Sequence, residues 1–129
     1  MKRSGILNRH LAGALAELGH GDEVLVCDAG MPIPPGPRVV DLAFTAGVPS
    51  FAEVLDGLLA ELVVEGATAA EEVRTAAPAT AGLLAERLPG LAYVSHEELK
   101  ARTPRARLVV RTGEATPYAN VSLRCGVFF

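Results

Sequence analysis

Glu23-Val24-Leu25-Val26-Cys27, followed by the turn-forming Asp28-Ala29-Gly30, is the stretch of sequence that decides the fold. Its four consecutive apolar residues are typical of a strand that is buried on both faces, as in a parallel sheet, whereas a half-exposed strand alternates apolar and polar residues. The sequence therefore predicts a short strand at the centre of an α/β domain.

Helical and extended patterns alternate around this strand. The clearest helix follows the cap residue Ser50, where apolar residues recur at helical spacing from Phe51 to Leu62. Further helices are expected at 7–18, 79–88 and 96–102, an ordered proline-rich loop at 31–37, and further strands at 38–44, 63–70 (running into a helix through 71–73), 91–95, 107–111 and 120–124. This alternation predicts a single three-layer α/β domain over residues 1–129, with a mostly parallel sheet flanked by helices.

Composition and charge exclude several classes of protein. Half of the 129 residues are apolar and 21% are charged, which excludes a disordered chain. No apolar stretch approaches the ~18 residues of a membrane-spanning helix, and the basic residues 1–5 are not followed by the apolar region of a signal peptide. The net charge of −3, without a basic block and with few aromatic residues, argues against nucleic-acid binding. A mean hydropathy of +0.29 is high for a small domain and predicts a buried interface in a homo-oligomer.

The cysteines and histidines do not form a recognisable metal motif. Cys27 and Cys125 lie in apolar segments and are expected to be buried thiols in a reducing cytoplasm. His20, Asp28 and His96 could form a ligand set, but no two of them are closely spaced. No metal or cofactor is expected, and a metal-dependent hydrolase stays as an alternative that a chelator would test. Neither phosphate-binding glycine motif nor Gly-x-Ser-x-Gly occurs.

Three polar residues lie where we expect the ligand cleft. Asp28 follows the first strand and His96 follows the strand at 91–95, and ligands bind outside the carboxyl ends of strands in open α/β sheets. His20 lies between two glycines in the turn 19–22, which leaves its imidazole unobstructed. The structural alternatives are a solvated turn residue for His20, a turn cap for Asp28 and a helix N-terminal residue for His96.

The loop 112–119 leads into Tyr118-Ala119-Asn120, which supplies an aromatic face, a hydroxyl and a side-chain amide. This mixture suits a polyol and equally suits a well-ordered turn. Arg111 and Glu114, three residues apart around the loop, are expected to form a structural ion pair.

The order of elements suggests that the candidate residues are divided between subunits. Tyr118 precedes a strand whereas Asp28 follows one, so the two are expected at opposite edges of a parallel sheet. A neighbouring subunit that contributes Tyr118 and Asn120 would bring the candidate residues together.

Five segments stand in a recognisable order and spacing. They are Leu7-Asn8, Gly19-His20-Gly21-Asp22, Val26 to Pro34, Gly47 to Phe51, and Arg111 to Glu114 with Pro117 to Asn120. With these motifs the chain resembles the D-ribose pyranase / L-fucose mutarotase family from Leu7 to Phe129. The segment 27–34 and Arg111 resemble the ribose branch more than the fucose branch.

The resemblance implies an enzyme that interconverts the β-pyranose and β-furanose forms of free D-ribose without a cofactor or metal. It implies a ring-shaped homo-oligomer, an octamer or decamer, with the site near subunit boundaries. By motif, His20 would be the proton donor, and the sugar would be bound by Asp28, His96, Tyr118, Ala119 and Asn120. The alternatives are a mutarotase acting on L-fucose or another monosaccharide, and a sugar-binding module without turnover, in which replacing His20 would change no chemistry.

Overall fold

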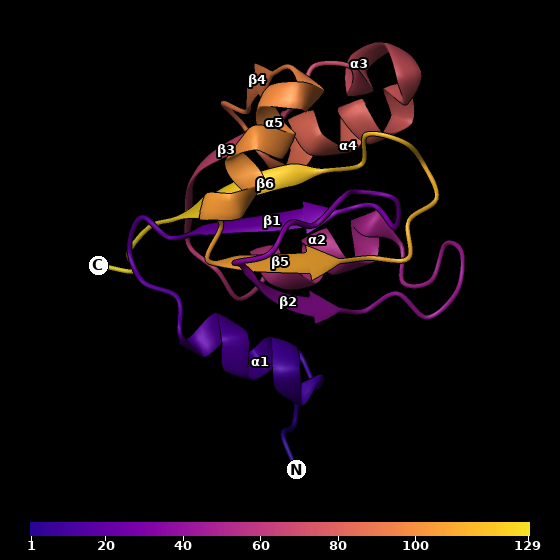
Figure 1. Ribbon diagram of the computed structural model, residues 1–129. Coiled ribbons are helices and arrows are strands. Elements are labelled where there is room, and N and C mark those ends of the chain that lie inside the picture. Colours follow the sequence, from indigo (N-terminus) through magenta and orange to yellow (C-terminus); the bar gives the residue numbers. More distant parts are fainter.

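A six-stranded sheet runs through the middle of the molecule, in the order β2-β5-β1-β6-β3-β4 (Figure 1). The computed structural model describes residues 1–129. The strands are β1 (Glu23–Cys27), β2 (Arg38–Asp41), β3 (Val64–Ala70), β4 (Ala92–Val94), β5 (Leu108–Arg111) and β6 (Val121–Cys125). The helices are α1 (Arg9–Ala16), α2 (Phe51–Leu59), α3 (Val73–Ala76), α4 (Pro78–Arg87), α5 (His96–Arg102) and the short 3-10 helix η1 (Thr103–Arg105).

Five of the strands run in one direction and β6 runs against them. β1 pairs in parallel with β5, β5 with β2, and β3 with β4, whereas β6 is antiparallel to both β1 and β3. The predicted mostly parallel sheet is confirmed. One edge of the sheet therefore carries the end of β1 and the start of β6, and we call it the Asp28 edge. The opposite edge carries the start of β1 and the end of β6, and we call it the His20 edge.

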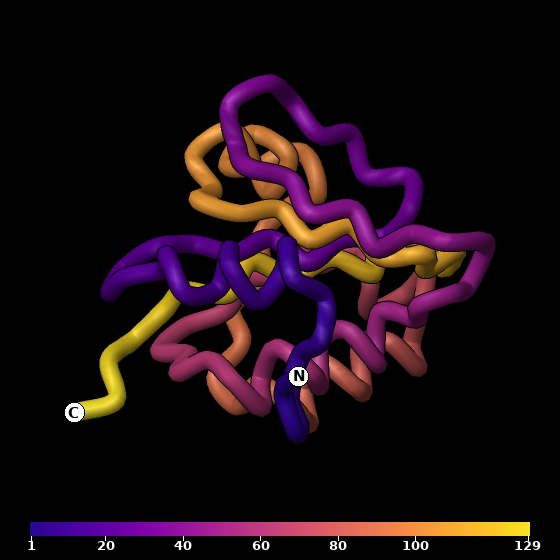
Figure 2. Tube along the Cα trace, turned by 90° about the horizontal axis from the view of Figure 1, so that it is seen from below, coloured from indigo at the N-terminus to yellow at the C-terminus, as the bar shows by residue number.

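The central strand β1 is covered on both faces, as its apolar run predicts. Val24 and Val26 face the larger core, which α1, α2 and α4 complete, while Leu25 and Cys27 face a smaller core with Met31. These four residues of β1 are at most 2% exposed. Seen along the sheet, α2 and α4 lie on one side and the proline-rich loop with α5 on the other (Figure 2). The predicted three-layer arrangement is confirmed.

Local sequence signals set most element boundaries. Ser50 and Glu53 form a reciprocal capping box at the start of α2, and Asn8 accepts backbone hydrogen bonds at the start of α1. The strand predicted to reach Phe44 ends earlier, at Asp41. Its neighbour β5 ends at Arg111, so Phe44 has no partner in the sheet and instead donates its N–H to the Val48 carbonyl.

Large apolar side chains remain exposed at both ends of the sheet. Phe44 is 86% exposed in the loop after β2, while Phe128 and Phe129 are both 89% exposed beyond β6. The C-terminal segment extends away from the rest of the chain (Figures 1 and 2). None of the helices combines the length and apolar character needed to cross a membrane.

Candidate active site

A cavity of about 340 Å³ opens at the Asp28 edge. Its walls are the turn after β1, the first residue of α5 and the loop before β6, and its lining residues include Asp28, Met31, His96, Thr116 and Tyr118. Volumes of roughly 300–1,000 Å³ are typical of small-molecule sites. Three of the predicted sugar-binding residues thus line one cavity within a single chain.

Asp28 is held in place by Asn120. The Asp28 N–H donates to Asn120 Oδ1 and Asn120 Nδ2 donates to Asp28 Oδ2, each at 2.9 Å. The other carboxylate oxygen of Asp28 accepts from the Gly30 N–H, also at 2.9 Å. Asn120 is fully buried whereas Asp28 is 9% exposed. Asn120 therefore holds Asp28 in place at the wall of the cavity.

His96 and Tyr118 form an aromatic corner of the cavity. Their rings meet edge to face with centroids 5.1 Å apart, and the His96 N–H donates to Glu72 Oε2 at 2.8 Å. The Nδ1 atom of His96 is buried and has no hydrogen-bond partner. Because buried polar atoms are nearly always paired in folded proteins, this nitrogen fits a hydrogen bond to a ligand hydroxyl. Tyr118 has a φ of 61°, a left-handed conformation that costs energy for a bulky residue.

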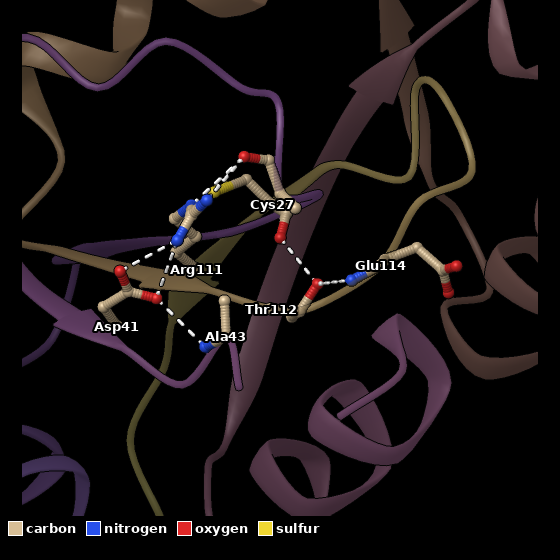
Figure 3. Close-up of polar contacts among 7 residues, drawn as sticks. Cys27, Asp41, Ala43, Arg111, Thr112 and Glu114 are labelled. Atoms are coloured by element: carbon tan, nitrogen blue, oxygen red, sulfur yellow. Dashed lines mark hydrogen bonds and ion pairs between the residues drawn. The ribbon is translucent and has the colours of Figure 1, made fainter. Parts of the chain in front are cut away.

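Arg111 fixes the turn that carries Asp28 (Figure 3). Its Nε and Nη2 atoms donate to the Ala29 carbonyl at 3.1 and 3.0 Å, and its Nη1 pairs with Asp41 at 2.9 Å. The expected ion pair with Glu114 is wrong. Asp41 lies directly opposite Arg111 in the parallel pairing of β2 with β5, whereas Glu114 turns away to accept the Phe51 N–H at 3.1 Å.

Thr112 links the end of β1 to the loop that follows β5 (Figure 3). Thr112 Oγ1 donates to the Cys27 carbonyl at 2.8 Å and accepts the Glu114 N–H at 3.1 Å. Burial, and secondarily the nearby Asp28 charge, raise the pKa of the Cys27 thiol to about 12. The thiol therefore stays protonated near neutral pH, which fits a packing role and not that of a nucleophile.

His20 lies at the opposite edge of the sheet from this cavity. His20 comes before β1 and Asp28 comes directly after β1. The five-residue strand between them keeps the two residues at least about 15 Å apart at the usual rise per residue. The Nε2 atom of His20 lies 3.0 Å from Glu65 Oε2. The expectation that His20 and Asp28 share a cleft is wrong within one chain, because the turn 19–22 is at the amino end of its strand.

The expected separation of Tyr118 and Asn120 from Asp28 is also wrong. Because β6 is antiparallel to β1, its first residues lie at the Asp28 edge. Ala119 and Asn120 are both fully buried behind the cavity. The length of the connection 112–120 between β5 and β6 could have revealed this, because the crossover between parallel strands usually needs a dozen or more residues.

A larger cleft of about 1040 Å³ lies at the His20 edge. Its lining is rich in charged side chains, among them Arg38, Arg105, Arg107 and Arg124. None of the predicted sugar-binding residues reaches it. No three His, Cys, Asp or Glu side chains anywhere in the chain lie close enough to hold a metal ion, and the two histidines and the aspartate considered as ligands lie at different edges.

Comparison with known protein families identifies the family to which this chain belongs. The model of the RbsD / FucU transport protein family matches residues 1–128. The chain belongs to this family. The resemblance seen in the sequence is thereby confirmed.

Relatives within the family match over their full lengths. A protein named D-ribose pyranase 2 from Streptomyces griseus subsp. griseus is 80% identical, and a D-ribose pyranase from Streptomyces avermitilis is 78% identical, each over 129 residues and 100% of both chains. Among solved structures, Bacillus subtilis RbsD complexed with D-ribose has a TM-score of 0.96 and 44% identity, covering 100% of both chains. The fucose mutarotase of Streptococcus pneumoniae in complex with L-fucose has a TM-score of 0.84 at 23% identity, also over 100% of both chains, and shows the shared fold.

Proposed function

We propose that this chain is a D-ribose pyranase, an intramolecular isomerase that interconverts the β-pyranose and β-furanose forms of free D-ribose. The observation that carries the proposal is the full-length identity of 80% and 78% to relatives of that name. The cavity at the Asp28 edge, with a carboxylate, an unpaired imidazole nitrogen and a phenol, offers the hydrogen-bonding groups that a sugar needs. We assign this function to the single domain formed by residues 1–129.

Ribose is favoured over fucose by the comparison with solved structures. The structure described as complexed with D-ribose has the TM-score of 0.96 at 44% identity. The fucose complex, at 23% identity, supports L-fucose only as the second candidate substrate.

The reaction needs proton transfer and no change of oxidation state. A proton leaves the hydroxyl on the anomeric carbon, the bond from that carbon to the ring oxygen breaks, and the ring oxygen takes up a proton. The neighbouring chain hydroxyl then attacks the aldehyde carbon and loses its proton as the carbonyl oxygen gains one. Positioned acid–base groups accelerate such steps by roughly 10²–10⁴-fold each.

We assign the proton transfer to His20 and sugar binding to the residues of the Asp28 edge. An imidazole both accepts and releases protons near neutral pH. Asp28, His96 and Tyr118 would contact the sugar, while the buried Ala119 and Asn120 would shape and hold the Asp28 turn.

The two halves of the proposed site meet only if two copies associate head to tail. The His20 edge of one copy would close the cavity at the Asp28 edge of the next, so that a ring of copies contains only complete sites. The exposed Phe44 at one edge, and Phe128 and Phe129 at the other, supply apolar surface for such a contact. We infer a ring-shaped homo-oligomer, an octamer or decamer, and a cytoplasmic location, which the two free cysteines fit.

Saturation-transfer NMR on D-ribose tests this function. We expect wild-type protein to accelerate pyranose–furanose exchange, and His20→Ala to abolish the acceleration. The matched control is His10→Ala, because His10 lies exposed on α1 and should leave the exchange rate unchanged.

Three further measurements separate this function from the alternative functions. Acceleration that appears only with L-fucose would assign the chain to the other activity of the family. Ribose binding without accelerated exchange would indicate a sugar-binding module. Loss of the activity on treatment with a chelator would overturn the metal-free mechanism.

A further inference from the structure

Glu65 occupies a β-bulge at the His20 edge. Where β3 pairs with β6, Val64 lies opposite Cys125 and Gly66 lies opposite Arg124, so Glu65 is an extra residue without a partner. A bulge of this kind bends the strand and redirects one side chain, and bulges are frequent beside active sites. The irregularity in β3 therefore frees the Glu65 side chain from the regular alternation of the sheet.

The redirected carboxylate joins two side chains, one on each oxygen. Glu65 Oε2 lies 3.0 Å from His20 Nε2, and Glu65 Oε1 lies 3.0 Å from Arg124 Nε. Because an ionised carboxylate only accepts hydrogen bonds, the hydrogen of this contact belongs to His20 Nε2. The other ring nitrogen of His20, Nδ1, is left without this hydrogen and carries the lone pair in the neutral ring.

The end of the chain leaves room for this arrangement. Gly126 donates its N–H to the Val63 carbonyl at 2.8 Å, beside the bulge. A Cβ atom at position 126 would lie 3.2 Å from the Glu65 Cβ and 3.6 Å from its Oε2. The first of these distances is tighter than ordinary contact, so a glycine at this position lets the Glu65 side chain lie where it reaches His20.

The carboxylate of the turn 19–22, that of Asp22, already has a hydrogen-bond partner. Asp22 Oδ2 accepts the Gly19 N–H at 2.8 Å, which closes the turn and leaves Glu65 as the carboxylate in contact with the imidazole. The side chains of His20, Glu65 and Arg124 are 58%, 37% and 59% exposed, and ion pairs at such exposed positions contribute little to folding stability.

We propose that Glu65 is the positioning residue for His20, that it holds the imidazole with Nε2–H toward its own carboxylate, and that Nδ1 is thereby presented to the sugar. Arg124 fixes the carboxylate from its other side. This inference rests on the proposed function, in which His20 transfers the proton. A partner on the second ring nitrogen sets both tautomer and ring orientation.

The test compares Glu65→Ala and Glu65→Gln with the wild type, and Asp56→Asn is the matched control. Asp56 is also an exposed carboxylate paired with an arginine, Arg87, but it lies on a different element, α2, and lines neither the cavity at the Asp28 edge nor the cleft at the His20 edge. We expect Glu65→Ala to lower kcat for ribose exchange about 10-fold, a part of the roughly 10²–10⁴-fold that a positioned acid–base group supplies, with KM unchanged. Glu65→Gln should recover most of that loss because its amide oxygen also accepts the Nε2–H. Asp56→Asn should match the wild type.

A spectroscopic measurement makes the test independent of turnover. Long-range ¹⁵N–¹H correlation spectra report which imidazole nitrogen carries the hydrogen, and we expect a single Nε2–H form for His20 in the wild type and in Glu65→Gln. In Glu65→Ala the two nitrogens should show averaged shifts. If Glu65→Ala has the same kcat as the wild type, or if its His20 spectrum is unchanged, the inference is overturned while the proposed function stays intact. A wild type that does not accelerate ribose exchange would instead overturn the proposed function.

Discussion

At the scale of single residues, the geometry of the cavity depends on Asn120, whose side chain pairs with both the backbone and the carboxylate of Asp28. We predict that Asn120→Ala lowers the free energy of unfolding by about 1–3 kcal/mol, because it leaves buried polar groups of Asp28 unpaired. It should also weaken ribose binding, since the carboxylate is no longer fixed. Denaturant unfolding and ribose titration measure the two effects.

A second asparagine separates stability from binding in this experiment. Asn8→Ala removes the N-cap of α1 and should cost a similar ~1 kcal/mol, yet it should leave ribose affinity unchanged. Equal affinity in the two variants would contradict the role given to Asn120.

The raised pKa of the buried Cys27 thiol makes the stability of the protein depend on pH at alkaline pH. Its pKa rises from the ordinary 9.0 to about 12 on folding, so the unfolded chain loses this proton at lower pH than the folded chain. The contribution of the thiol to stability is therefore full below pH 9.0 and is lost as the pH rises toward 12. We expect the free energy of unfolding to fall above pH 9 by as much as about 1.4 kcal/mol per pH unit from this group.

Urea unfolding at several alkaline pH values measures this slope. Cys27→Ala should have a shallower slope than the wild type. Burial also raises the pKa of the Cys125 thiol, so part of the slope should persist in that variant. Identical slopes in the two proteins would show that Cys27 titrates normally in the folded chain.

At the scale of elements, the loop between β5 and β6 is held against the hairpin after β2. Gly113 donates its N–H to the Pro49 carbonyl and accepts from the Gly47 N–H. A Cβ atom at position 113 would lie 2.7 Å from the Thr45 carbonyl oxygen and closer still to that of Val48. We predict that Gly113→Ala lowers the thermal unfolding temperature and costs about 1–3 kcal/mol through overpacking.

A glycine-to-alanine substitution at position 82 should instead raise the stability of the protein. Gly82 lies inside α4, and apart from the adjoining backbone of that helix no atom lies within 4 Å of a Cβ built there. Gly82→Ala should therefore stabilise the chain by about 0.5–1 kcal/mol, the usual gain inside a helix. A Gly113→Ala variant as stable as Gly82→Ala would contradict the close approach of the two loops.

Elements with local signals could be predicted from the sequence and those that depend on a partner could not. The bounds of β1 and α5 agree with the prediction, because an apolar run and the Ser95 cap define them locally. The pairing of β6 with β1 and β3 and the end of β2 depend on neighbours distant in sequence. For this reason Asp28 and His96 could be placed at one edge in advance, whereas the pairing of Asp28 with Asn120 could not.

At the scale of the whole molecule, the proposed head-to-tail arrangement predicts complementation between inactive variants. Copies with His20→Ala lack the group to which we assign the proton transfer, and copies with Asp28→Asn lack the carboxylate of the cavity. After unfolding and refolding of an equal mixture, random assembly should restore about a quarter of the sites, because each site takes one residue from each of two neighbours. The ribose exchange rate of the mixture measures this fraction.

Each variant refolded alone serves as the control and should stay inactive. If His20 and Asp28 acted within one chain, no mixture would regain activity, since every copy carries one of the two defects. Light scattering on the same samples would count the copies in each assembly.

The placement of His20 and Asp28 at opposite ends of β1 has a consequence for how the activity scales with concentration. A free copy carries halves of two different sites and no complete one, so on the proposed arrangement turnover belongs to the assembly and not to the chain. Mass action then governs the yield of working sites. Diluting the protein below the dissociation constant of the ring would extinguish catalysis in copies that are still correctly folded.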